Sequence, residues 1–243
     1  AVAGITRTSG DLTLDAGSNA ITQSGAIDIA TGTADLTGGV ITLEGANKLG
    51  SVTVNSGTGD LSLTEDDAIA VAGITRTSGD LTLDAGSNAI TQTGAIDIAT
   101  GTAGLSGGAI TLEGANVLGA VTVSYGSGDV SLTENDTISI AGITRAEGDL
   151  TLNAGTNSIG QSGPILVDDG AVSLSGGGIT LENANILGAV TVNSGAGTVS
   201  LTENDAISVA GISRADGDLT LNAGTNAITQ SGAIAVDDGT VSI

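Results

Sequence analysis

Several kinds of residue are missing from this sequence of 243 residues. It has no Cys, His, Met, Trp or Phe, and only one Tyr and one Pro. Without Cys, disulfides and thiol chemistry are excluded, and the redox compartment stays undetermined. Val, Ile and Leu are then the bulky apolar residues that fill the interior, so we expect that interior to be narrow. No uninterrupted apolar run approaches the length of a membrane span, and we expect no membrane insertion.

Positive charge is also scarce. The chain has 5 Lys and Arg against 27 Asp and Glu, which gives a net charge of −22 at pH 7. Nucleic acid phosphates and anionic membrane surfaces attract Lys and Arg, so we expect neither as a partner. Self-repulsion of this size keeps a long β structure soluble.

What the chain does have is a long internal repeat. Residues 1–69 recur at 70–138 with twelve substitutions, then at 139–207, and in part at 208–243. Such a chain presents its surface chemistry periodically, whereas an enzyme needs one asymmetric site, so we predict a single continuous solenoid segment over 1–243. Because the sequence begins and ends inside a repeat, we expect further copies as partners, either covalent or stacked head to tail.

Each copy contains a finer pattern of an apolar residue, Thr or Ser, and Leu, followed by Asn or Asp and an aliphatic residue. The pattern starts at Leu12, Ile41, Leu61 and Leu81, so that one long interval is followed by two shorter, equal ones. Its period of two is that of a strand, so the sequence predicts an all-β, parallel β-helix with about three coils per copy and these four residues stacked inward. The extra residues 32–40 predict a longer turn or an additional short strand that bulges from one side. A separate β-sandwich for each copy is disfavoured, because it would have to close its own core without aromatics.

Two series of polar residues accompany this pattern. A file of hydroxyls, beginning Thr13, Thr42 and Ser62, is expected to point outward; such files can order ice-like water, but β-branched hydroxyl residues also simply suit exposed strands. A file of Asn and Asp, beginning Asn19, Asn47 and Asp67, is expected at one corner of every coil, where these residues stabilise turns. The structural interpretation is favoured for both.

Acidic turns give a candidate cation site in each copy. Carboxylates are the ligands that Ca²⁺ prefers, although the spacing of calcium β-rolls and EF-hands is absent. Calcium is therefore a weak candidate cofactor, and a solvated acidic corner is the alternative. The candidate ligands are Glu65, Asp66, Asp67, Glu134, Asp136, Glu203 and Asp205.

Catalysis is not expected. Carboxylates alone cleave polysaccharides in some β-helix proteins, but those sites gather them once with basic or aromatic groups. Here the Arg residues recur singly, once in each copy, at Arg7, Arg76, Arg145 and Arg214. We predict that this segment is not an enzyme and has no catalytic residues.

Four sequence segments resemble those of a known protein family. They are GDLTLDAG at 10–17, AITQSGAI at 20–27, ITLE at 41–44 and GSVTV at 50–54. They resemble the repeat regions of filamentous haemagglutinin-like proteins, the large secreted exoproteins and adhesins of Gram-negative bacteria. The resemblance covers essentially the whole chain. It implies a right-handed parallel β-helix, a secreted or cell-surface location, and a role in an adhesive or structural fibre. A module that binds Ca²⁺, carbohydrate or ice through its repeated faces is the alternative function.

Overall fold

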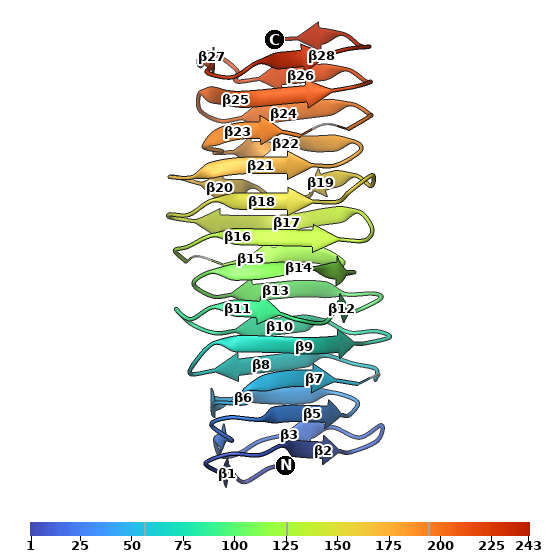
Figure 1. Ribbon diagram of the computed structural model, residues 1–243, viewed down its shortest axis with the longest axis vertical. Coiled ribbons are helices and arrows are strands. Elements are labelled where there is room, and N and C mark those ends of the chain that lie inside the picture. The colour runs from blue at the N-terminus through green and yellow to red at the C-terminus, as the bar shows by residue number, and fades with distance from the viewer. Residues whose placement is uncertain (56, 125, 194) are drawn as a thin grey trace. The chain divides into compact units, whose positions relative to one another are not determined.

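The computed structural model describes residues 1–55, 57–124, 126–193 and 195–243 (Figure 1). These residues form strands and turns and contain no helix, so none of them belongs to a helix that could cross a membrane. The chain divides into two compact units, Ala1–Ala120 and Val121–Ile243, which are described in turn. That both belong to one continuous solenoid stays a prediction.

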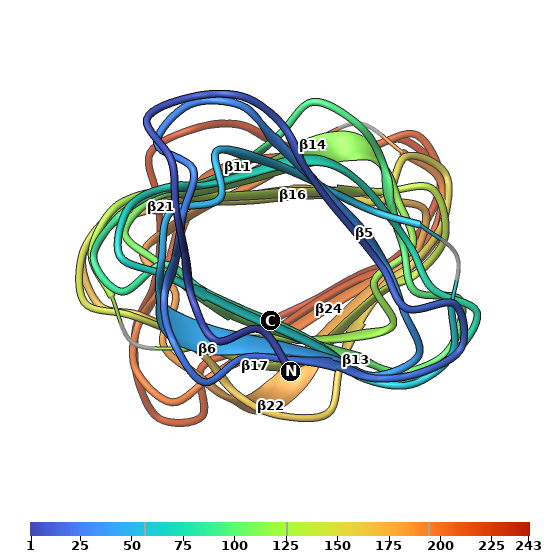
Figure 2. The same cartoon turned by 90° about the horizontal axis from the view of Figure 1, so that it is seen from below.

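Unit 1 consists of two parallel sheets whose strands alternate along the chain. The first sheet has the order β2 (Leu12–Asp15), β5 (Thr33–Thr37), β7 (Ser51–Val54), β9 (Ile69–Thr75), β11 (Ile90–Gln92) and β14 (Ile110–Asn116). The second has the order β3 (Ile21–Thr22), β6 (Ile41–Asn47), β8 (Leu61–Glu65), β10 (Leu81–Asp84) and β13 (Thr102–Ser106). Figure 2 shows β5, β11 and β14 on one wall and β6 and β13 on the facing wall. Short strands lie at a corner, where β1 (Ile5–Thr6) pairs with β4 (Ile27–Asp28) and β12 (Ile96–Asp97) pairs with β9.

Unit 2 repeats this arrangement. One sheet has the order β16 (Val130–Glu134), β18 (Leu150–Asn153), β21 (Ala171–Ser175), β23 (Ala189–Val192), β25 (Ile207–Arg214) and β27 (Ile228–Gln230). The other has the order β17 (Ile138–Arg145), β19 (Ile159–Gln161), β22 (Ile179–Asn185), β24 (Val199–Glu203), β26 (Leu219–Asn222) and β29 (Val241–Ser242). The corner strands are β20 (Ile165–Val167) and β28 (Ile234–Val236), and β15 (Ala120–Val123) spans the boundary between the units. Each unit is therefore a parallel β-solenoid without helices in its described residues, and the predicted fold class is confirmed.

The number of turns per copy differs from the expected three. In the second sheet of unit 1, Ile21, Ile41, Leu61 and Leu81 are successive partners on neighbouring turns. Leu12 lies in the other sheet and pairs with Ala34. One copy therefore makes three and a half turns, and equivalent residues of successive copies lie on opposite sheets. The prediction that Leu12 stacks on Ile41 was wrong, because the motif marks only some of the half-turns.

The long interval between Leu12 and Ile41 explains this difference. It contains one full turn and an additional half-turn, and the additional half-turn carries β5. Leu36 of this strand is fully buried and pairs with Leu14 and Val54. The additional short strand that we expected exists, but it is a regular part of the wall and does not bulge from it.

The core is a stack of aliphatic side chains, as the alternating pattern predicts. In β8 the buried residues Leu61, Leu63 and Glu65 alternate with half-buried Ser62 and Thr64. The alternation also predicts that the second Leu of each motif, Leu14, Leu43 and Leu63, is fully buried, and Leu43 and Leu63 are. Leu14 was expected to be buried as well, but it is only half-buried, in the first complete strand of unit 1.

The additional half-turn that carries β5 also changes which residues form the two polar files expected from the sequence. The hydroxyl file of the second sheet in unit 1 is Thr22, Thr42, Ser62 and Thr82, whereas Thr13 lies beside Asp35. The Asn and Asp residues do not share one corner either: Asn47 is fully buried, while Asn19 is exposed and bonds the Ala16 carbonyl at 3.1 Å.

Candidate functional site

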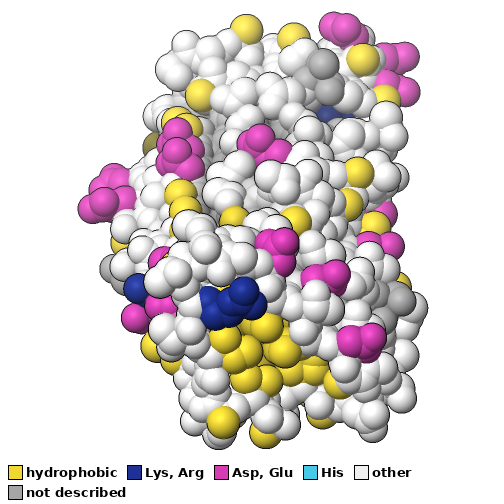
Figure 3. Space-filling model, turned by 60° about the horizontal axis from the view of Figure 1, so that its bottom comes forward, with side chains coloured by type: hydrophobic (Ala, Val, Ile, Leu, Met, Phe, Trp, Pro, Cys, Tyr) yellow, Lys and Arg dark blue, Asp and Glu magenta, His cyan; other side chains and the backbone are white. Residues whose placement is uncertain are grey.

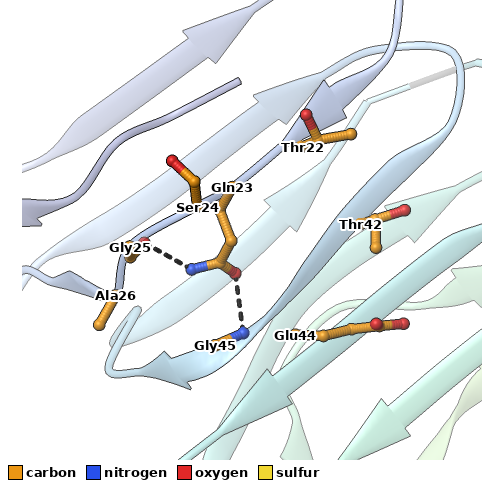
Figure 4. Close-up of a pocket in the computed structure, with 8 residues that line it drawn as sticks. All are labelled: Thr22, Gln23, Ser24, Gly25, Ala26, Thr42, Glu44 and Gly45. Atoms are coloured by element: carbon orange, nitrogen blue, oxygen red, sulfur yellow. Dashed lines mark hydrogen bonds between the residues drawn. The ribbon is translucent and has the colours of Figure 1, made fainter.

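A pocket of about 420 Å³ opens on the outer surface of unit 1 (Figure 4). It is lined by two neighbouring turns, residues 22–26 at and after β3, and Thr42, Glu44 and Gly45 of β6. An equivalent pocket, also of about 420 Å³, is lined by residues 92–95 and by Thr111, Glu113, Gly114 and Ala115 of β14. Since β6 and β14 belong to different sheets, the two pockets open on opposite walls.

Small residues create this hollow because the backbones approach closely there. A Cβ atom on Gly25 would lie 2.0 Å from the carbonyl oxygen of Ala3, on the preceding turn. A Cβ on Gly45 would lie 2.6 Å from Nε2 of Gln23. Glycine at these places lets the corner close tightly, and the missing side chains leave the pocket.

Gln23, which lines the pocket, pairs with the buried side-chain amide of Asn47. Nε2 of Gln23 donates to the Gly25 carbonyl and to Oδ1 of Asn47, each at 2.8 Å. Oε1 of Gln23 accepts from the Gly45 N–H at 3.0 Å and from Nδ2 of Asn47 at 2.9 Å. Oδ1 of Asn47 also accepts from the Ile27 N–H at 2.9 Å. The amides thus bind the corner together, as buried polar groups must.

This amide corner recurs in the next two copies. Gln92 pairs with Asn116, and Gln161 with Asn185, at 2.8–2.9 Å. The third copy has Asn183 where the first two have Gly45 and Gly114, and its N–H lies 3.4 Å from Oε1 of Gln161. The longer contact fits the crowding expected when a side chain is added there.

The groups of the first pocket that face solvent are hydroxyls and one carboxylate. Thr22, Ser24 and Thr42 line it with Glu44, whose Oε1 accepts a hydrogen bond of 2.6 Å from the Ser62 hydroxyl. Such a surface can hold a polar ligand by hydrogen bonds. The sequence offers no His or Cys to add a base or a thiol nucleophile.

The structure does not gather three of the candidate calcium ligands of the described residues into one group. Glu65, Glu134 and Glu203 are each 3% exposed and point into the core. Oε2 of Glu65 accepts from the Leu49 N–H at 2.9 Å, and Oε2 of Glu203 accepts from the Leu187 N–H at 3.0 Å. Asp67 is half-buried, whereas the exposed candidates are Asp66, Asp136 and Asp205. Within the described ranges, no three acidic side chains gather into a group that could hold a metal ion.

Burial changes the ionisation of these glutamates. Burial is the largest cause that raises the pKa of Glu65. The Leu49 N–H lowers this pKa, the charge of Asp67 and a hydrogen bond with it raise it, and together these effects place it at about 8. The pKa of Glu203 is raised to about 8 by the same causes, with Leu187 and Asp205 in the corresponding places.

Three of the four arginines are buried, which sequence reasoning missed. Arg76, Arg145 and Arg214 are 1–2% exposed, whereas Arg7 is exposed. Burial lowers the pKa of each buried guanidinium. The only sequence signal for this burial was that an Arg recurs once in each copy, but buried structural residues and surface residues both recur in this way.

Arg76 binds backbone carbonyls of the two turns before it. Nη1 donates to the Gly38 carbonyl at 2.9 Å, and Nη2 donates to the carbonyls of Gly39 and, at 2.7 Å, of Gly59. Arg214 makes the same three bonds to the corresponding glycines, Gly176, Gly177 and Gly197. Each of these two arginines therefore joins three successive turns along the axis.

The repeat is also recognised as a family. A family described as repeats of unknown function (DUF5649) matches residues 2–56, 58–124, 127–193 and 196–243. The matches that begin at 58, 127 and 196 are evenly spaced, with the same period as the amide corners and the buried arginines. No curated protein and no solved structure matches the chain. The chain belongs to the family of repeats of unknown function (DUF5649).

Proposed function

We propose that this chain is a shaft segment of a secreted or cell-surface fibrous protein, in which it supplies length, stiffness and display. The carrying observation is that polar side chains join one turn to the next: the amide corner does so in all three complete copies, and the buried arginine does so at Arg76 and Arg214. The amide corner and the buried arginine both bind backbone groups of neighbouring turns. Because these side chains hold the stacked turns together, they favour a mechanical role.

Composition and resemblance support this proposal. Acidic side chains are scattered over the face shown in Figure 3, in keeping with the net charge of −22. Scattered like charges oppose edge-to-edge association of β structure. The resemblance to filamentous haemagglutinin-like repeats adds the secreted or surface location, a Gram-negative source and an adhesive fibre.

The proposed partners follow from the repeat. Further copies, covalent or stacked head to tail, would extend the ladder, and nucleic acid and membrane insertion are not expected. The segment is proposed to act without catalysis. The host or surface ligand of such a fibre is not specified by these residues.

Immunogold electron microscopy tests the proposal. Antibodies raised against this chain should label intact cells of the source organism, with gold distributed along surface fibres. Labelling at fibre tips alone would contradict a shaft and favour a terminal binding module. Absence of label from both intact cells and culture medium would contradict the proposed location.

The alternative function, a binding module, is favoured by the recurrence of the pocket in two copies. A carbohydrate would suit its hydroxyls and the Glu44 carboxylate better than Ca²⁺ or ice would. A glycan array probed with the parent and with Thr42→Val tests it: binding by the parent that is lost in the variant would support this alternative over the shaft.

A further inference from the structure

Glu65 and Glu203 are buried glutamates in which one carboxyl oxygen accepts a hydrogen bond and the other does not. Oε2 of Glu65 accepts from the Leu49 N–H at 2.9 Å. Oε1 of Glu65 is buried, and so is Oδ1 of Asp67, and among the described residues neither oxygen has a hydrogen-bond donor. Oε1 of Glu203 is likewise buried and has no hydrogen-bond donor among the described residues. A buried ionised carboxylate with an unsatisfied oxygen is strongly disfavoured.

A proton between the two carboxyl groups resolves this problem. Glu65 and Asp67 are close enough for a side-chain hydrogen bond. When Glu65 is protonated, its O–H can donate to Oδ1 of Asp67, which satisfies both buried oxygens at once. Two adjacent carboxylates, by contrast, repel each other when both are ionised.

The charged residues around Glu65 and Asp67 do not supply the missing hydrogen bonds of this pair. Near Glu65, Lys48 and Asp66 are exposed, and Asp84, on the next turn, accepts from the Gly86 N–H at 2.9 Å. Glu44, on the preceding strand, is exposed and bonded to Ser62.

The third copy is a natural control for these neighbours. Ile186, Asn204 and Asn222 replace the three charged residues Lys48, Asp66 and Asp84. Glu203 nevertheless keeps its burial and its bond to a backbone N–H. The common feature of the two sites is the glutamate with the aspartate two positions later.

We propose that Glu65 and Asp67 share one proton at neutral pH, and that Glu203 and Asp205 do the same. Each of these two sites then takes up one proton as the chain folds. The site is a proton-binding site built into the solenoid and is independent of any ligand on its surface.

The sign of the resulting pH dependence is fixed. The pKa of Glu65 is about 8 in the fold against 4.5 for an ordinary glutamate. Between these values the folded chain holds a proton that the unfolded chain has released. The stabilising contribution is therefore complete below about pH 4.5 and is lost as the pH rises through about 8. Over that window the unfolding equilibrium constant should rise about tenfold per pH unit for each retained proton.

Two double variants carrying the same change of charge test the proposal. The inner variant is Glu65→Gln with Glu203→Gln. The control variant is Glu44→Gln with Glu182→Gln, at exposed positions. Urea unfolding from pH 5 to pH 9 should show the steep loss of stability in the parent and the control, and a clearly flatter profile in the inner variant. Equal slopes in all three proteins would overturn the shared proton.

Infrared spectroscopy of the unmodified chain gives a second readout that does not depend on the variants folding. The carbonyl band of protonated carboxyl groups should persist at pH 7 and disappear around pH 8. Absence of this band at pH 7 would overturn the proposal. So would a stabilisation by millimolar Ca²⁺ at pH 7 that the inner variant lacks, since the paired oxygens would then hold a cation.

Discussion

At the scale of residues, the buried arginine is the charged group of the repeat that most needs hydrogen-bond partners. A guanidinium removed from water normally needs a carboxylate partner. The charge of Asp60 acts on Arg76, but the hydrogen bonds of its guanidinium go to the carbonyl oxygens of Gly38, Gly39 and Gly59. Its planar fork of N–H groups can reach several carbonyls on different turns, which a lysine ammonium cannot match.

Replacing this arginine should therefore destabilise the fold strongly. We expect Arg76→Ala to lower the free energy of unfolding by about 3 kcal/mol or more, because three bonds from a charged donor are lost and buried carbonyls are left without donors. Arg7→Ala is the matched control, since Arg7 is exposed, and it should change stability by at most about 0.5 kcal/mol. Urea unfolding followed by circular dichroism measures both free energies of unfolding, and equal effects would contradict the role of Arg76 in joining the turns.

The inside and outside of the strands can be tested at two adjacent residues. Leu83 is fully buried and Thr82 is exposed, in the same strand β10. Leu83→Asp should cost about 4 kcal/mol or more, because it places a charge in an apolar stack without a partner. Thr82→Asp should leave the melting temperature almost unchanged. If the two variants melt alike, the assignment of the two faces is wrong.

The sequence predicted some of these residues and not others. The alternation in β8 identifies Leu61 and Leu63 as core residues, because a period of two needs only neighbouring positions. It would also have placed Glu65 inside, but we interpreted that residue as part of an acidic turn because of its charge. The contacts of Arg76 could not be predicted, since they reach as far back along the chain as Gly38 and depend on which turns are adjacent.

At the scale of elements, tight corners determine how closely successive turns approach. Gly94 lies at the corner after β11, where a Cβ atom would come within 1.9 Å of the Ala72 carbonyl oxygen. Gly160 lies inside β19, where a Cβ atom would have no neighbour within 4 Å. The same residue type thus has opposite roles in two different elements.

This contrast gives a prediction for a single methyl group. Gly94→Ala should destabilise the fold by about 2 kcal/mol, because the turns must separate at that corner. Gly160→Ala should be neutral or stabilising by about 0.5 kcal/mol, since Ala restricts the unfolded chain. Thermal unfolding of both variants distinguishes them, and a neutral Gly94→Ala would show that the corner is looser than described.

Strands were predictable from the sequence, but their pairing was not. The recurring motif correctly marks β2, β6 and β8 as strands. It does not mark β5 as a regular wall strand, so the half-turns between Leu12 and Ile41 were counted wrongly. Pairing depends on the total number of half-turns in a copy, and that number is odd. An odd number moves each motif to the opposite sheet in the next copy, as Leu12 and Leu81 show.

At the scale of the whole molecule, the odd number of half-turns affects display. Within unit 1, a surface group that recurs once in each copy lies on opposite walls in successive copies, as the two equivalent pockets do. If further copies repeat this order, a flat ligand would meet the same group only in every second copy. This geometry favours a fibre with similar sides over a module that binds through one repeated face.

The most direct test of the central claim, that each copy adds turns to one ladder, is the length of arrays that differ only in copy number. Three and a half turns at the strand spacing of about 4.8 Å predict an increment of about 17 Å per copy. Cryo-electron microscopy of arrays with increasing numbers of copies should give a straight line with this slope and a constant width. Particles that widen with copy number, or that grow as separate globular beads, would contradict the account.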